Sequence, residues 1–65
     1  MRLWKMNGAG NAFAVYDARE QYFDPTVRHL RSTAKKMKVD QIMAIQADLR
    51  ANAFLRIWNA DGSEV

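Results

Sequence analysis

Two short segments of the chain concentrate the groups that could contact a small ligand. Asn7-Gly8-Ala9-Gly10-Asn11 places two glycines and two asparagines in five residues. That composition predicts a tight turn whose backbone can reach positive φ or approach a ligand closely. Asn59-Ala60-Asp61-Gly62-Ser63 predicts a second turn. Their amide side chains can donate to a carboxylate and accept from an ammonium group without adding charge to a site.

Acid–base and metal chemistry has few candidates in the sequence. There is no cysteine and one histidine, His29. The chain therefore offers no disulfide and no thiolate metal ligand, and a single imidazole cannot hold a metal alone. His29 lies one position off the apolar stripe of a predicted helix, so we expect a flanking or partly buried residue rather than a catalytic one. The 65 residues alone are expected to be catalytically inactive.

The hydrophobic pattern predicts the order β-β-α-β-β and an α+β fold. Strands are predicted at 2–6 and 12–16, joined by a five-residue loop, and at 42–45 and 54–58, joined by a polar connection at 47–52. On the last strand, Leu55, Ile57 and Asn59 should share one face, and Phe54, Arg56 and Trp58 the other.

One amphipathic helix is predicted from Pro25 to Lys36, with Asp24 as its N-cap and Pro25 at the first helical position. Val27, Leu30, Ala34 and Met37 recur at spacings of three, four and three, which places them on one helical face. The predicted core consists of Leu3, Phe13, Val15, Val27, Leu30, Ile42, Ile45, Leu55, Ile57 and Trp58.

The net charge of +3 is unevenly distributed. Five of the ten basic residues fall between Arg28 and Lys38. This cluster predicts a solvated helix face, and a phosphate-binding patch on a small nucleic-acid-binding module is the alternative. The longest apolar runs are far below the roughly 20 residues that span a bilayer, and the first residues have no apolar signal region. We therefore expect a cytoplasmic location and no membrane partner.

A domain of this size buries only about 60% of the surface of its unfolded chain, so it is marginal alone. The strongest predicted strand is followed by no linker or charged tail. We therefore expect a fragment of a larger protein that is poorly stable or oligomeric in isolation.

Two motifs resemble those of the diaminopimelate epimerases. The segment from Lys5 to Phe13, KMNGAGNAF, resembles the family's opening motif KMHGLGNDF, and the segment from Asn59 to Val65 matches the family motif NADGSEV throughout. Asp40-Gln41 resembles a D-Q or D-G pair that precedes a hydrophobic strand in the family. The motifs occur in the family's order and spacing across the whole chain.

The resemblance implies an isomerase that interconverts LL- and meso-diaminopimelate for lysine and peptidoglycan-precursor synthesis. Such enzymes use no cofactor, including no pyridoxal phosphate, and no metal. Two cysteines, one from each of two similar domains, act on opposite faces of the substrate's α-carbon. The resemblance places residues 1–65 in the first domain, in which strands wrap a central helix, and places the first cysteine just after Val65. The rest of the epimerase chain would be a partner of residues 1–65. Whether the full-length protein is a homodimer stays open.

By the same resemblance, Asn11, Gln41 and Asn59 are substrate-binding residues. The ordinary alternative for each is an amide that satisfies local backbone at a turn or strand end. The sequence departs from the family at Ala12, at Asn7 and at Lys36 and Lys38, where the family has glycines. The lost glycines bear on the backbone before Gln41. Another racemase or isomerase of the same superfamily is the closest alternative function.

Overall fold

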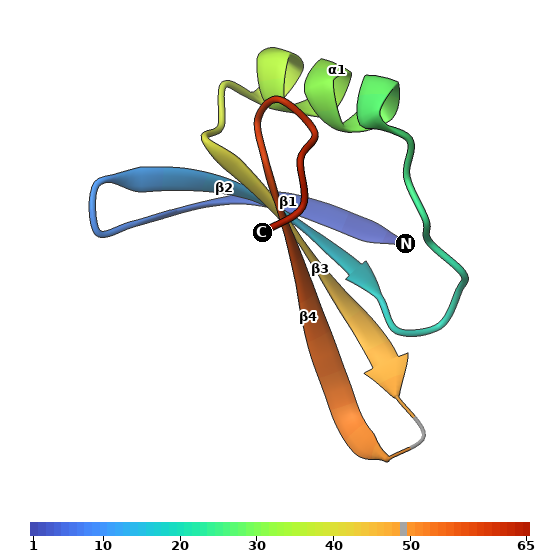
Figure 1. The fold of residues 1–65 in the computed structure, drawn as a ribbon. Helices are drawn as coiled ribbons and strands as arrows, with labels where there is room; N and C mark the ends of the chain where they lie inside the picture. Colours follow the sequence, from blue (N-terminus) through green and yellow to red (C-terminus); the bar gives the residue numbers. More distant parts are fainter. Residues whose placement is uncertain (49) are drawn as a thin grey trace.

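The computed structural model describes residues 1–48 and 50–65, which form a four-stranded sheet with a helix on one of its faces (Figure 1). Its elements, in chain order, are β1 (Arg2–Gly8), β2 (Asn11–Ala18), α1 (Val27–Met37), β3 (Gln41–Asp48) and β4 (Ala51–Asn59). This confirms the α+β class and the predicted order. The arrangement in which strands wrap a central helix stays a prediction.

The sheet is mixed, with the spatial order β1-β2-β3-β4. The β1–β2 and β3–β4 pairs are antiparallel hairpins, whereas β2 and β3 are parallel. Parallel neighbours need a long crossover connection, and α1 supplies it. The connection predicted at 47–52 is largely wrong, because β3 continues through Asp48 and β4 begins at Ala51; Leu49 lies outside the described residues.

The first hairpin turns more tightly than predicted. Gly8 pairs with Asn11, so the loop is Ala9-Gly10 rather than five residues. Both loop residues have positive φ, 52° and 82°, as a two-residue turn of the primed type requires. The flanking Gly8 and Asn11 are therefore part of the ladder, and Asn11 is the first residue of β2.

The helix begins later than predicted. Thr26 is the N-cap, and its hydroxyl oxygen accepts a hydrogen bond from the His29 N–H at 3.1 Å. Asp24 and Pro25 precede the cap, and the Asp24 carboxylate instead accepts from Tyr22 and Arg56 side chains. The two predicted positions at the helix start were therefore wrong.

The helix ends at a lysine in an unusual backbone conformation. Lys38 has φ of 56° and ψ of 53°, the left-handed conformation that glycine usually provides at this point. The Val39 N–H then donates to the Ala34 carbonyl at 3.1 Å. The chain thus makes the turn into β3 without the glycines that its resemblance suggested.

The core lies between α1 and the sheet, and Leu30, Ile42 and Trp58 are buried in it as predicted. Val15 is also buried, as predicted, but its side chain lies on the opposite face of the sheet. The prediction was wrong for Leu3, Val27 and Leu55, which are 43%, 55% and 55% exposed. Leu3 lies on the edge strand, Val27 on the first helical turn, and Leu55 on the face opposite the helix. Other buried positions are occupied by residues that the predicted core did not include: Ala14, Ala18, Val39 and Ala44, together with Tyr16.

The two faces of the sheet differ in what covers them. Pairing places Ala14, Ile42 and Trp58 in one row beneath α1. Alternation then places the following side chains on the other face, here called the open face: Trp4, Met6, Phe13, Val15, Met43, Ile45, Leu55 and Ile57. In the described part of the chain, α1 is on the opposite side, so this largely apolar face has no helix over it.

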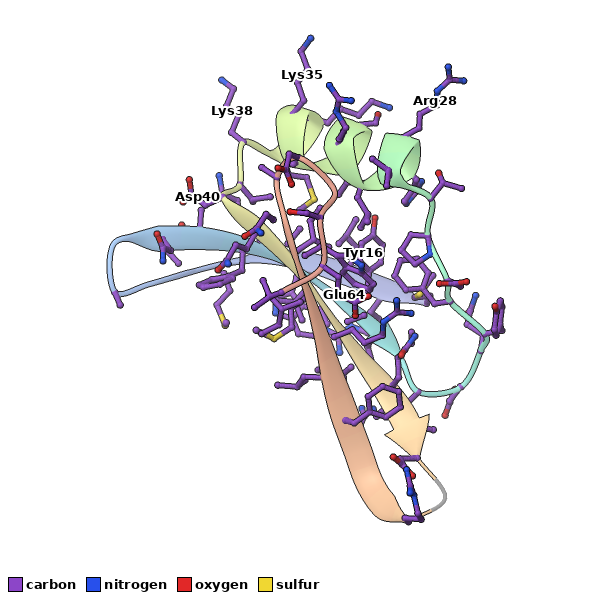
Figure 2. The ribbon with its side chains drawn as sticks, in the orientation of Figure 1. Tyr16, Arg28, Lys35, Lys38, Asp40 and Glu64 are labelled. Atoms are coloured by element: carbon purple, nitrogen blue, oxygen red, sulfur yellow. The ribbon has the colours of Figure 1, made fainter. Side chains whose placement is uncertain are left out.

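The basic cluster forms an exposed helix face, as predicted. Arg28, Arg31, Lys35, Lys36 and Lys38 are all exposed, and Figure 2 shows Arg28, Lys35 and Lys38 directed away from the sheet. No helix among the described residues is long and apolar enough to cross a membrane.

Candidate substrate-binding site

The three amide residues predicted from the sequence come together at one end of the open face. Asn11 begins β2, Gln41 begins β3 and Asn59 ends β4. Gln41 pairs with Asn59 on one side and with Phe13 on the other. Asn11 lies two residues before Phe13, so it projects from the same face, about 7 Å along the strand. Three segments that are distant in sequence therefore present amides to one surface.

A directed chain of hydrogen bonds orients two of these amides. Gln41 Nε2 donates to Asn59 Oδ1 at 3.3 Å, and Asn59 Nδ2 donates to Ser63 Oγ at 3.0 Å. Ser63 Oγ donates in turn to Asp61 Oδ1 at 2.6 Å. Asn59 thus uses both ends of its amide within the protein. Gln41 uses one N–H in this chain of bonds, and no partner among the described residues bonds its carbonyl oxygen or its second N–H, so both can reach a ligand.

The carboxylate at the end of that chain is held ionised. The Ser63 hydroxyl and the Ser63 backbone N–H, at 2.8 Å, both donate to Asp61. These bonds favour the charged form and lower the pKa of Asp61, the hydroxyl bond most. Asp61 therefore acts only as an acceptor at neutral pH. This fixes the direction of every bond in the chain: Gln41 donates to Asn59, Asn59 to Ser63 and Ser63 to Asp61.

Apolar side chains adjoin the amides on the open face. Phe13 is half-buried beside Gln41, and Met6 pairs with Phe13 on the neighbouring strand. Met43, the next open-face residue along β3, is also half-buried. Hydrogen bonds strengthen where water is excluded, so a cover over this apolar surface would strengthen contacts to the amides. A hollow of about 570 Å³ lies elsewhere, between residues 18–24 and Gln46. The three amides lie at one end of the open face and do not line that hollow.

Comparison with known proteins identifies relatives along nearly the whole chain, although no family model matches it. The diaminopimelate epimerase of Phenylobacterium zucineum is 42% identical over 64 residues, which is 94% of this chain and 23% of that protein. Those of Acidiphilium cryptum and Rhodopseudomonas palustris are 44% and 45% identical over 92% of this chain. The chain is homologous to the diaminopimelate epimerases. It spans about a quarter of the length of the curated relatives that it matches.

Ser63 and Asp61, which orient the amides, were not identified as site residues from the sequence. A signal was present, because Asp and Ser two residues apart in a turn commonly form side-chain to backbone bonds of this kind. What the spacing did not reveal is that Ser63 also reaches Asn59. That contact needs the turn to fold back along β4, where the Asn59 N–H donates to the Ser63 carbonyl at 2.8 Å.

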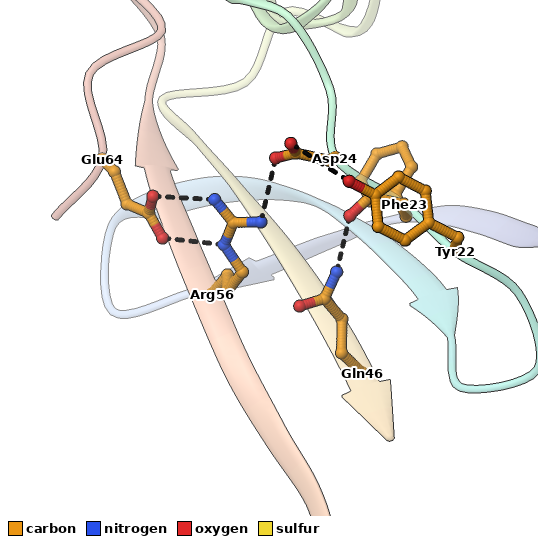
Figure 3. Close-up of polar contacts among 6 residues, drawn as sticks. All are labelled: Tyr22, Phe23, Asp24, Gln46, Arg56 and Glu64. Atoms are coloured by element: carbon orange, nitrogen blue, oxygen red, sulfur yellow. Dashed lines mark hydrogen bonds and ion pairs between the residues drawn. The ribbon is translucent and has the colours of Figure 1, made fainter. Parts of the chain in front are cut away.

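The last residues run along the outer edge of β4. The Val65 N–H donates to the Ile57 carbonyl at 2.8 Å, and Glu64 forms a bridge with Trp58. Arg56 secures this segment from the helix side of the sheet (Figure 3): Nε and Nη2 each donate to Glu64 at 2.9 Å, and Nη1 donates to Asp24 at 3.3 Å. The Glu64 hydrogen bonds contribute most to raising the pKa of Arg56, and Arg56 lowers that of Glu64.

His29 has a structural partner. Its Nε2 lies 3.2 Å from the hydroxyl of buried Tyr16, which also lies 3.1 Å from Thr33 Oγ1. These contacts are on the helix side of the sheet, away from the amides, in agreement with a flanking histidine. Within residues 1–48 and 50–65, no three metal-ligating side chains gather at one point.

Proposed function

We propose that this chain is part of a diaminopimelate epimerase, in which Asn11, Gln41 and Asn59 bind the substrate. The observation that carries the proposal is their placement, from three separate strands, at one end of one sheet face. The relatives' shared name supports the reaction. The remainder of the protein would supply the two thiols, which this chain lacks.

The chemistry of the amides suits an amino-acid substrate. A diaminopimelate molecule carries carboxylates and ammonium groups, and an amide can donate to the former and accept from the latter. Gln41 keeps a carbonyl oxygen for an ammonium group, and Asn11 lies on the same face, about 7 Å along β2 from the residue that pairs with Gln41. Neutral amides leave the local charge unchanged, so they do not oppose a thiolate base. Proton removal would need such a base at a fixed position relative to the α-carbon.

Alanine substitution in the full-length protein tests the binding role. Gln41→Ala removes an amide that contacts a charged substrate group, and a hydrogen bond of that kind contributes about 1.5–3 kcal/mol. We expect kcat/KM for LL-diaminopimelate to fall by roughly 10- to 100-fold.

Gln46→Ala is the matched control. Gln46 is an amide on the same strand, but it points to the helix side, where its Nε2 donates to the Phe23 carbonyl at 2.7 Å (Figure 3). Its loss should affect stability and leave kcat/KM within about twofold. Equal losses in the two variants would contradict a binding role for Gln41.

A further inference from the structure

Asp40, immediately before β3, forms hydrogen bonds to two other segments of the chain. Its Oδ2 accepts from the Ala12 N–H at 2.9 Å, and its own N–H donates to the Ala12 carbonyl at 2.9 Å. Its carbonyl accepts from the Ala60 N–H at 3.1 Å. Figure 2 shows Asp40 at the start of β3, beside the β1–β2 hairpin. One residue thereby ties together the starts of β2 and β3 and the turn after β4.

Each of these bonds is made one residue away from a proposed substrate-binding amide. Ala12 follows Asn11, Ala60 follows Asn59, and Asp40 itself precedes Gln41. A hydrogen bond on the peptide next to a residue fixes the orientation of that peptide, and hence the direction in which the neighbouring Cα–Cβ bond points. The Asp40 contacts therefore control the relative directions of all three amides.

Of these three hydrogen bonds, one depends on the Asp40 side chain, namely the bond that its carboxylate accepts. The two backbone bonds could form with any residue except proline at this position, whereas the bond to the Ala12 N–H requires an acceptor on the side chain. In effect Oδ2 replaces a strand carbonyl and extends the β2–β3 ladder by one bond, just before its first paired residues, Phe13 and Gln41. An ionised acceptor makes a stronger bond than a neutral one.

We propose that Asp40 is a positioning residue, whose carboxylate aligns Asn11, Gln41 and Asn59 for substrate. The inference rests on the proposed function of those amides. It assigns Asp40 no contact with substrate and no proton transfer.

The test compares three variants of the full-length protein. Asp40→Ala removes the acceptor, and Asp40→Asn retains an oxygen that can accept from Ala12. Asp48→Ala is the matched control, because Asp48 Oδ1 also accepts a backbone N–H, that of Arg50 at 2.8 Å, but at the other end of β3. For diaminopimelate epimerisation, we expect Asp40→Ala to raise KM about tenfold, Asp40→Asn to recover most of this loss, and Asp48→Ala to stay within twofold.

A purely structural role would give a different result. Loss of folded protein lowers apparent kcat and leaves KM unchanged, so an unchanged KM in Asp40→Ala, or equal effects in Asp40→Ala and Asp48→Ala, would overturn the proposal.

Side-chain amide NMR of protein labelled with ¹⁵N at Asn and Gln separates this inference from the proposed function. If the unsubstituted protein does not epimerise diaminopimelate, the proposed function fails, and the NMR comparison still decides the role of Asp40. We expect Asp40→Ala to shift the resonances of Asn11, Gln41 and Asn59, and Asp48→Ala to leave them in place. Unshifted resonances in Asp40→Ala would overturn the positioning role.

Discussion

Gly62 is the point at which the turn carrying Asn59 packs on the start of α1. It has φ of 93°, and a Cβ added there would lie 2.6 Å from Val27 Cγ1 and 3.2 Å from the Val27 Cα. The Cα belongs to helical backbone, so it cannot move aside as a flexible side chain can. Gly62→Ala should therefore destabilise the protein and displace the turn from the helix.

Two other glycines allow the contributions to be separated. Gly10 also has positive φ, 82°, but an added Cβ would meet nothing within 4 Å; Gly8 has the same open space and no positive φ. Gly10→Ala should cost about 1–2 kcal/mol for the left-handed backbone alone. Gly62→Ala adds about 1–3 kcal/mol of overpacking to a similar backbone cost, or about 2–5 kcal/mol together. Gly8→Ala should change stability by less than about 1 kcal/mol.

Urea unfolding of the full-length variants measures this series, with differences taken from the midpoints at constant m-value. The expected order of stability is Gly8→Ala, then Gly10→Ala, then Gly62→Ala as the least stable. The Gly62 variant should also lose kcat/KM, because its turn carries Asn59. If Gly62→Ala proves as stable as Gly10→Ala, the docking of the turn against Val27 is wrong.

Three further predictions concern the core, the acid response and the open face. Leu30→Ala should cost about 2–5 kcal/mol in urea unfolding, since Leu30 is almost fully buried between α1 and the sheet; a loss below about 1 kcal/mol would contradict that packing. Arg56 lowers the pKa of Glu64 below its ordinary value of 4.5, so this ion pair stabilises the fold fully above that pH and its contribution disappears as pH falls through the folded-state pKa. Glu64→Gln should remove this part of the acid sensitivity, measured by thermal unfolding between pH 6 and 3, whereas Glu20→Gln should retain it. The 65-residue chain alone should self-associate through its open face in analytical ultracentrifugation, and a cooperative, monomeric thermal transition would contradict this.

The strand pattern allowed the two faces of β4 to be predicted correctly. Alternation along β4 separated Ile57 and Asn59 from Arg56 and Trp58, and the pairing of β4 with β3 bears this out. The start of the helix was less predictable, because Asp24 and Thr26 are both good N-cap residues. In the structure Thr26 accepts from the His29 N–H, whereas Asp24 accepts from the side chains of Tyr22 and Arg56.

The identity of the buried residues and the hydrogen bonds of Asp40 could not be predicted from the sequence, because both depend on tertiary packing. Ala14 and Ala44 are buried because small side chains let α1 approach the sheet closely, and hydrophobicity alone favours larger residues such as Leu55. The bond from Asp40 to Ala12 joins positions 28 residues apart, so it exists only once β2 and β3 are in register. The motif resemblance pointed to Asn11, Gln41 and Asn59 individually, whereas their common surface follows from that register.

Exchange of the substrate's α-hydrogen with solvent tests the proposed epimerase most directly. The full-length protein, reduced, would be incubated with LL-diaminopimelate in deuterated buffer, and deuterium at the α-carbon would be followed together with the appearance of the meso isomer. We expect deuterium incorporation accompanied by meso-diaminopimelate, and much slower exchange in Gln41→Ala than in Gln46→Ala. Absence of exchange by a folded, reduced protein would contradict the proposed function.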